Sequence, residues 1–254
     1  MSAEVLTLHL PDVTLIAVTS VALDATVAAL VTTMSGIRFG AVRLLSDTKP
    51  ANLPASIEWY TISPLHSRQD YSNFIQRELR DYVATPFALL IQWDGFVLRP
   101  EQWQPQFTEY DYIGALWPQF SDGRNVGNGG FSLRSRRLLE ATANLPHNAD
   151  EPEDTFICRR HRAELEDGAG LRFAPEQIAR RFAFERTAPT GAEFGFHGIF
   201  NLVRLLTDQE FRVLLSGLEP GLLGRREYRE LVRHLFWRGR WRTLATLVKQ
   251  RRSG

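Results

Sequence analysis

The sequence contains a single cysteine, Cys158, among its 254 residues. One thiol excludes an internal disulfide and a zinc site built from several cysteines, and it is compatible with a reducing compartment. No apolar run approaches the roughly 18 residues that a membrane-spanning helix needs, and the first twenty residues lack the basic cluster that begins a secretory signal. We therefore expect a cytoplasmic protein that is neither secreted nor inserted into a membrane.

The sequence also lacks an excess of either charge, because 30 Lys and Arg residues oppose 29 Asp and Glu residues. The resulting net charge of +1 provides no overall basic field, which argues against nucleic acid as a partner. The charges are nevertheless unevenly placed. From Arg225 to the end, ten Lys or Arg residues face two acids, a net charge of +8 that leaves −7 on the rest of the chain.

Short apolar runs alternate with amphipathic segments through the first hundred residues. The runs predict strands at 13–19, 40–45, 57–62 and 87–92, and the amphipathic segments predict helices at 24–31 and 67–83. This alternation indicates an α/β fold with a mostly parallel, buried sheet. Ligands of such sheets bind beyond the carboxyl ends of the strands, where Thr19, Ser20, Asp47 and residues 92–95 are expected.

Glycine and turn residues become frequent after Glu109. Residues 110–117 and 131–134 predict two further strands, residues 135–145 predict a helix, and the chain reads as helical again after Gly198. We predict one domain at residues 1–200 and a basic helical extension at residues 201–254.

Asp94 and His197 are the candidate metal ligands. Asp94 leaves a buried strand within Gln92-Trp93-Asp94-Gly95, where a carboxylate can hold a divalent cation that bridges two phosphates. An Asp-Gly pair also forms a tight turn without any ligand. His197 lies among aromatic residues and glycines, which is typical either of a pocket wall or of a hydrogen-bonded core histidine.

Three glycines stand within four residues in the segment Val126-Gly127-Asn128-Gly129-Gly130. They allow the backbone to approach a ligand closely, or they form a hairpin lead-in. The segment precedes a strand rather than a helix, so it matches neither a P-loop nor a dinucleotide fingerprint. Further along, Glu153 and Asp154 begin a predicted helix, where they act either as a general base with its neighbour or as helix-capping acids.

Taken in order, these segments resemble the GT-A class of nucleotide-sugar-dependent glycosyltransferases. The chain is similar to a family of largely uncharacterised microbial and fungal proteins with QWDG, EYDYIGALW, VGNGGFSLRS, EDTF and FGFHG segments. The resemblance covers roughly residues 13–198. It implies a GT-A-like, Rossmann-type mixed sheet flanked by helices, with the basic helices as an appendage.

The resemblance also implies roles for individual residues. Asp94 and His197 would hold Mn²⁺ or Mg²⁺, and Asp154, or its neighbour Glu153, would be the catalytic base. Gln92-Trp93-Asp94 carries one acid where the common motif carries two, so diphosphate oxygens and water would complete the metal site. A carboxylate that activates an acceptor hydroxyl, rather than attacking the sugar, inverts the anomeric configuration.

The implied substrates are a UDP- or GDP-linked sugar donor and a saccharide or lipid-linked glycan acceptor. Residues at the ends of the early strands would contact the base and ribose, glycines would approach the donor, and arginines would meet its phosphates. The full set of predicted donor contacts is Thr19, Ser20, Asp47, Arg77, Asp94, Gly129, Gly130 and Arg134.

The basic extension has two interpretations. Its arginines alternate with Phe236, Trp237, Trp241 and Leu244, so it either lies on the inner face of an anionic membrane or packs its aromatic residues onto the first domain. The predicted function is accordingly a glycosyltransferase. The alternatives are a non-catalytic protein that binds a nucleotide or a glycan, and a peripheral membrane interaction module.

Overall fold

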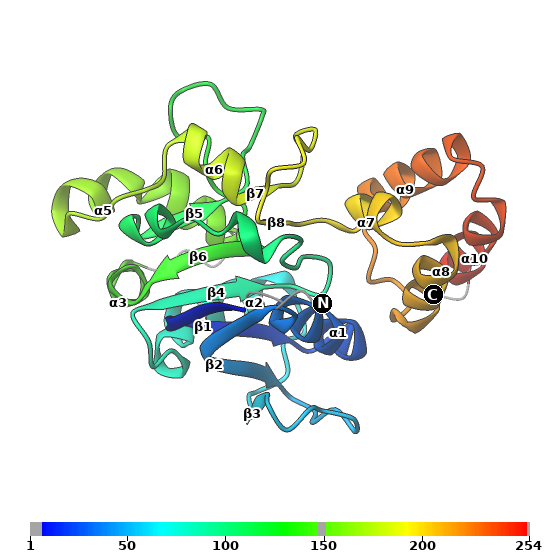
Figure 1. The fold of residues 1–254 in the computed structure, drawn as a ribbon, viewed down its shortest axis with the longest axis horizontal. Helices are drawn as coiled ribbons and strands as arrows, with labels where there is room; N and C mark the ends of the chain where they lie inside the picture. Colours follow the sequence, from blue (N-terminus) through cyan, green and yellow to red (C-terminus); the bar gives the residue numbers. More distant parts are fainter. Residues whose placement is uncertain (1–6, 147–150, 253–254) are drawn as a thin grey trace, which may run out of the picture.

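The computed structural model describes residues 7–146 and 151–252, so the first six residues of the predicted domain and the last two of the extension lie outside it. Most strands form one sheet in the larger part of the molecule (Figure 1). The strands are β1 (Leu8–Thr19), β2 (Ile37–Ser46), β3 (Glu58–Thr61), β4 (Phe87–Ile91), β5 (Tyr112–Gly114), β6 (Phe131–Ser135), β7 (Ala183–Phe184) and β8 (Gly195–Phe196).

Helices connect and cover these strands. They are α1 (Leu23–Met34), α2 (Arg68–Arg77), α3 (Arg136–Ala143), α4 (Glu153–Thr155), α5 (Arg162–Ala169), α6 (Glu176–Phe182), α7 (Ile199–Leu205), α8 (Asp208–Gly217), α9 (Arg225–Trp237) and α10 (Trp241–Arg252). Short 3₁₀ turns span η1 (Leu79–Tyr82), η2 (Pro100–Gln102) and η3 (Pro105–Glu109), and a π-helical turn, η4 (Phe156–Arg160), extends α4.

The main sheet has six strands in the order β3-β2-β1-β4-β6-β5. The first four strands along the chain are parallel, whereas β6 runs antiparallel to both β4 and β5. This arrangement confirms the predicted fold class, a mixed α/β sheet flanked by helices.

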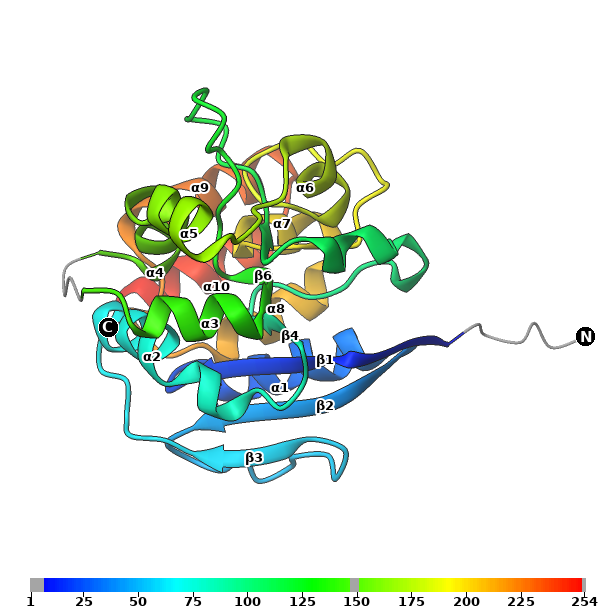
Figure 2. The same cartoon turned by 90° about the vertical axis from the view of Figure 1, so that its left-hand side faces the viewer.

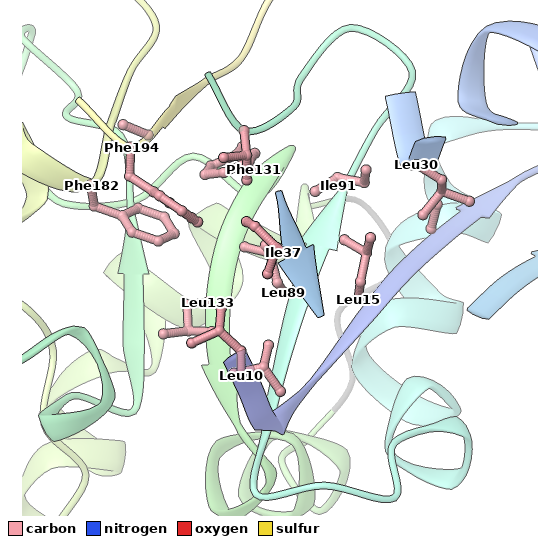
Figure 3. Packing of buried hydrophobic residues seen from close by; sticks show 14 of the residues in the cluster. Leu10, Leu15, Leu30, Ile37, Leu89, Ile91, Phe131, Leu133, Phe182 and Phe194 are labelled. Carbon is pink, nitrogen blue, oxygen red and sulfur yellow. The ribbon is translucent and has the colours of Figure 1, made fainter. Parts of the chain in front are cut away.

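Successive side chains of β1 enter two different cores, because side chains alternate between the faces of a strand. Leu15 packs in the same core as Leu30 of α1, and this core continues to Phe131 and Phe194 (Figure 3). Ile16 packs on the opposite face with Phe74 of α2. Figure 2 shows α2 and α3 in front of the sheet, with α1 behind it. Burial on both faces explains why β1 and β4 read as continuous apolar runs.

The connections reverse direction at β1. From β1 the chain moves outward to β2 and then β3, and it returns to place β4 on the other side of β1. In open α/β sheets, such a switch point leaves a crevice at the carboxyl ends of the two strands. Those ends are Thr19 and Ile91, each followed by polar residues of the predicted site.

Helices α7 to α10 lie to one side of the sheet (Figure 1). They form a core of their own around Phe211, Leu231 and Leu235, which also takes in Ala22 and Phe196 from the sheet domain. The predicted boundary at residue 200 therefore falls within a shared core. Among the described residues, no helix is long and apolar enough to cross a membrane.

β1 begins five residues before the predicted strand, most other elements differ by a few residues at their ends, and two predicted elements are shortened or divided. The strand predicted at 110–117 is limited to Tyr112–Gly114, because the chain then leaves β6 and Leu116 pairs with Val126 instead. The helix predicted at 67–83 is divided at Glu78 into α2 and η1.

Candidate functional site

A cavity of about 680 Å³ opens at the switch point, beyond the carboxyl ends of β1 and β4. It brings together residues that are more than 200 positions apart in sequence, from Val18 to Glu227. Eight of the predicted site residues line it: Thr19, Ser20, Asp94, Gly129, Gly130, Glu153, Asp154 and His197. Asp47, Arg77 and Arg134 are not among its lining residues.

Asp94 and His197 form the floor of one side of this cavity. The Oδ2 atom of Asp94 accepts a hydrogen bond of 2.9 Å from the backbone N–H of Ile199, and Oδ1 lies 3.2 Å from Nε2 of His197. On the other side of the imidazole, Nδ1 lies 3.5 Å from Oε1 of Glu185. His197 therefore stands between two carboxylates.

This arrangement favours the ionised forms of both partners. Burial acts to lower the pKa of His197, but the charges of Asp94 and Glu185 and their hydrogen bonds raise it to about 10. Burial acts to raise the pKa of Asp94, yet the His197 charge and the Ile199 hydrogen bond leave it below its usual value. In the absence of another cation, the pair is a buried carboxylate and imidazolium.

The same groups could hold a small divalent cation, in a site where the protein supplies few of the ligands. Oδ1 of Asp94 is buried and makes no well-aligned hydrogen bond, and Oε1 of Gln92 lies 3.1 Å from the same His197 nitrogen. Glu185 stands behind the imidazole, where metal-binding histidines commonly have a carboxylate partner. Within the described ranges no group of three or more His, Cys, Asp or Glu side chains is arranged to hold a metal ion, so diphosphate oxygens and water would supply the remaining ligands.

Gly129 and Gly130 are required by the packing of this site. A Cβ atom on Gly130 would overlap with the imidazole of His197, and one on Gly129 would overlap with the carboxylate of Glu153. Asn128 precedes them with a φ of +40°, in the left-handed region that asparagine tolerates. The glycine segment thus presses its backbone against two functional side chains, a role that the hairpin interpretation does not include.

Asp154 and Glu153 are adjacent in sequence but have different environments. Asp154 is partly exposed, and its carboxylate accepts hydrogen bonds from the backbone N–H groups of Gly129, at 3.2 Å, and Thr155, at 2.7 Å. Glu153 is buried, with Oε1 3.0 Å from the Arg134 guanidinium. Burial raises the pKa of Glu153 to about 7 even though Arg134 opposes this shift. Asp154 is thus the carboxylate that is free to meet a ligand.

Two predicted phosphate contacts lie elsewhere. Arg134 is completely buried behind the cavity wall, where it contacts Glu153, Ser132 and the ring of Tyr112. Arg77 is in the last turn of α2 and donates to the carbonyl of Ala143. A ligand in the cavity would touch neither of these two side chains.

Arg68 is the one arginine among the described residues that line the cavity. It begins α2, nine residues before Arg77, so the two are about 14 Å apart along the helix axis. Its guanidinium lies 3.4 Å from Glu227 of α9, across the rim of the cavity. The sequence contained no signal that favoured Arg68 over Arg77, because their positions in the predicted helix do not show which end of α2 faces the cavity.

Thr19 is the last residue of β1, Ser20 follows it, and both line the cavity. The hydroxyl of Ser20 accepts a 2.9 Å hydrogen bond from the backbone N–H of Leu65. A hydrogen bond from Ser20 is also the main reason why the pKa of Asp47 lies below its usual value. Asp47 is therefore tied to a residue of the cavity wall, although it is not itself part of that wall.

Several buried polar atoms facing this region lack hydrogen-bond partners within the described part of the chain. They are the Tyr71 hydroxyl, Oδ1 of Asp94, Oδ1 of Asn128 and Oε2 of Glu153. All four residues line the cavity. Since nearly all buried polar groups in folded proteins are hydrogen-bonded, this concentration indicates a place for a polar ligand. Sequence analysis missed the side chains of Tyr71 and Asn128 as part of this cavity, whereas it placed Gln92 at this edge of the sheet.

The C-terminal helices complete the wall. Leu222, Leu223 and Glu227 line the cavity, and both carboxylate oxygens of Glu219 accept from the backbone N–H of Ala22. Ala22 has a φ of +50° at the start of α1, so the loop before α9 supports a strained turn next to Thr19. The predicted extension is therefore a part of the site.

Comparisons with known proteins give one sequence family and a distant structural similarity. Residues 55–197 match the family described as "Protein of unknown function (DUF5672)", a range that includes Asp94, Gly129, Asp154 and His197. No protein with a curated description matches the sequence.

The structure is similar to that of a glycosyltransferase involved in the glycosylation of the major capsid of PBCV-1. The sequence identity is 13%, the similarity covers 73% of this chain and 91% of that chain, and the TM-score is 0.42. Similarity at this level shows neither a shared activity nor shared substrates.

Proposed function

We propose that this chain, which belongs to the DUF5672 family, is a glycosyltransferase that moves a sugar from a nucleotide-sugar donor to a saccharide or lipid-linked glycan acceptor. The observation that carries the proposal is the convergence of four separate motifs on one cavity at the switch point of the sheet. Asp94, Gly130, Asp154 and His197 each come from a different motif, and all line that cavity.

The donor diphosphate fits the side of the cavity that holds the cationic groups. As the sugar leaves, negative charge grows on the diphosphate, and a preorganised positive charge stabilises it. Arg68 at the rim and His197 on the floor offer such charge. A Mn²⁺ or Mg²⁺ ion held by Asp94 and the neutral form of His197 would supply Lewis-acid stabilisation at the same place, instead of the imidazolium charge.

We assign the nucleoside to the opposite part of the cavity, at Thr19 and Ser20. Polar groups at the end of β1 suit hydrogen bonding to a ribose or a base, and Asp47 helps to fix the Ser20 hydroxyl through their shared hydrogen bond. The uracil and guanine bases of UDP- and GDP-sugars both meet this description.

Asp154 is the proposed general base. Its carboxylate is partly exposed in the cavity, and two backbone N–H groups fix its orientation. Taking the proton of an acceptor hydroxyl lets that oxygen attack the anomeric carbon from the face opposite to the diphosphate, which inverts the configuration. Glu153 has a supporting role, because its ion pair with the buried Arg134 holds the first turn of α4 against the glycine segment.

The test is the variant Asp154→Asn, which keeps the shape and the Gly129 hydrogen bond but removes the base. We expect sugar transfer from the accepted donor to fall by at least about a hundredfold, while nucleoside diphosphate still raises the apparent melting temperature. Glu151→Gln, two residues before the cavity acids, is the matched control and should keep its activity. Unchanged transfer by Asp154→Asn would exclude Asp154 as the base.

A panel of nucleoside diphosphates, with and without Mn²⁺, provides the complementary test. A protein that binds nucleotide but shows no transfer with any donor and acceptor tried would support the non-catalytic alternative. A protein whose melting temperature responds to no nucleoside diphosphate would contradict both interpretations.

A further inference from the structure

Aromatic side chains gather on the outside of the turn that joins α9 to α10. Trp237 is 78% exposed, Trp241 57% and Phe236 51%. The ring of Phe236 lies 5.9 Å from that of Trp237 and 5.1 Å from that of Trp241, so the three form one contiguous group. Isolated exposed apolar residues are ordinary, whereas a contiguous aromatic group on a surface indicates an interaction site.

The fold does not need these rings. Leu231 and Leu235 of α9 and Leu247 of α10 supply the buried face of the two helices. Phe236, Trp237 and Trp241 are exposed and do not belong to that core, which contradicts the interpretation that they pack onto the first domain, whereas Leu244 does pack against the core. The three exposed rings are therefore available to contact another molecule.

Arginines surround the aromatic group. Arg233, Arg238 and Arg242 are exposed, and none forms an ion pair with any residue that the structure describes. Arg204 belongs to the same region, because its charge and those of Arg238 and Arg233 act with burial to lower the pKa of His234.

The acids of this region are already engaged. Glu230 pairs with Arg186, and Asp208 pairs with Arg212 and accepts from the hydroxyl of Thr243. Among the described residues, no acidic side chain therefore neutralises the arginines around the aromatic group, and the surface there is positively charged.

We propose that Phe236, Trp237, Trp241 and the flanking Arg238 and Arg242, here called the aromatic-arginine surface, dock the protein on an anionic lipid membrane. Indole rings favour the boundary between lipid headgroups and acyl chains, and arginines pair with headgroup phosphates. The surface lies at a helix turn that protrudes at the edge of the molecule (Figure 1). A protruding turn can enter a lipid surface, whereas it offers no groove for a partner's helix or strand.

Docking would also bring the cavity close to the membrane. Glu227 of the cavity wall and Trp237 of the aromatic-arginine surface lie on the same helix, ten residues and thus about 15 Å apart along its axis. If the proposed function is correct, this distance favours a lipid-linked acceptor over a soluble one. Vesicle binding itself does not depend on catalysis, so it can be tested separately.

The experiment measures sedimentation of the full chain with vesicles of phosphatidylcholine alone and of phosphatidylcholine with phosphatidylglycerol in a three-to-one mixture. We expect binding to the anionic vesicles at low salt, weakened by high salt, and little binding to the neutral ones. Trp237→Ala combined with Trp241→Ala should weaken binding about tenfold. Arg238→Gln combined with Arg242→Gln should weaken it about fivefold per arginine.

Matched controls come from the same helical region. Val213→Ala changes another exposed apolar residue, and Arg225→Gln combined with Arg226→Gln removes two exposed arginines from the opposite end of α9. Both controls should bind anionic vesicles as tightly as the native protein does. Far-ultraviolet circular dichroism and thermal unfolding establish that every variant is folded.

Three results would overturn the proposal. They are no binding of the native protein to anionic vesicles at low salt, equal binding by the native protein and the tryptophan variant, and equal loss in the control variants. A concentration-dependent dimer that the tryptophan substitutions abolish, without vesicle binding, would instead assign the surface to a second copy of the chain.

Discussion

The two charged regions of this molecule are built in opposite ways. Around the cavity, Asp94, Arg134, Glu153 and His197 are buried or nearly so, and each lies within ion-pair distance of an oppositely charged group. At the α9–α10 turn, Arg233, Arg238 and Arg242 are exposed and have no ion-pair partner among the described residues. Buried charges must be compensated inside the protein, so changes there affect folding first. Exposed charges remain available to other molecules, so changes there affect binding.

The largest predicted effect concerns the buried pair. Arg134→Met keeps most of the side-chain volume but leaves Glu153 buried without its partner, which should lower the free energy of unfolding by about 3–5 kcal/mol. Chemical denaturation measures this change. Arg180→Met, which breaks an exposed pair with Glu176, is the control and should cost less than about 1 kcal/mol.

The combination of Arg134→Met with Glu153→Gln sharpens this prediction. If an uncompensated charge is the cause, the double variant should recover part of the lost stability. A loss of stability in Arg134→Met no greater than that in Arg180→Met would show that the buried and exposed regions do not differ as described.

The second prediction concerns the glycine segment. Gly130→Ala places a methyl group against the His197 imidazole, so we expect a destabilisation of about 1–3 kcal/mol by overpacking. Nucleotide binding should weaken as well, since the imidazole must move. Gly168→Ala in helix α5 is the control, because no atom lies within 4 Å of the added Cβ. This substitution should leave the free energy of unfolding unchanged or slightly higher. Native-like stability and nucleotide affinity in Gly130→Ala would contradict the packing role.

The sequence predicted the convergence of the site better than its details. Asp94 follows β4, and Thr19 and Ser20 stand at the end of β1. The rule that ligands bind at the carboxyl ends of parallel strands places them at one edge of the sheet, and all three line the cavity there, while their roles in binding stay predictions. That rule depends only on strand order and direction, which the alternation of apolar runs and helices makes readable.

The side-chain environments were not readable in the same way. Arg134 was predicted to meet phosphate, but alternation along β6 turns it toward Glu153 and Tyr112. Arg68 was missed because only the packing of α2 shows that its first turn faces the cavity. Leu222 and Leu223 were missed because their contact with the cavity arises from long-range folding of the C-terminal helices.

The third prediction uses the titration of Glu153. Its pKa is raised from 4.5 to about 7 in the folded protein, so between these values the folded state holds a proton that the unfolded state releases. The free energy of unfolding should therefore decrease as pH rises through this window and level off above it. Glu153→Gln removes the group, so the native protein should lose stability relative to this variant between pH 4.5 and 7.

Denaturation curves of both proteins across the window measure this difference, and the exposed Glu164→Gln serves as the control. A constant stability difference between the native protein and Glu153→Gln would contradict the raised pKa. It would mean that Arg134 keeps the Glu153 carboxylate ionised in spite of burial.

The smallest predicted effect on stability lies where the two regions meet. Arg68 of α2 pairs with Glu227 of α9 at the cavity rim, and its side chain is 87% exposed. Arg68→Gln should therefore change the free energy of unfolding by less than about 1 kcal/mol. If the guanidinium contacts the donor phosphates, however, the affinity for nucleoside diphosphate should fall severalfold while the affinity for the nucleoside is unchanged. Calorimetric titration of both ligands separates these outcomes, with Arg77→Gln at the far end of α2 as the control. An equal loss of affinity for nucleoside and nucleoside diphosphate would mean that Arg68 shapes the rim and does not contact phosphate. The positive charge that stabilises the leaving group would then come only from the buried groups around His197.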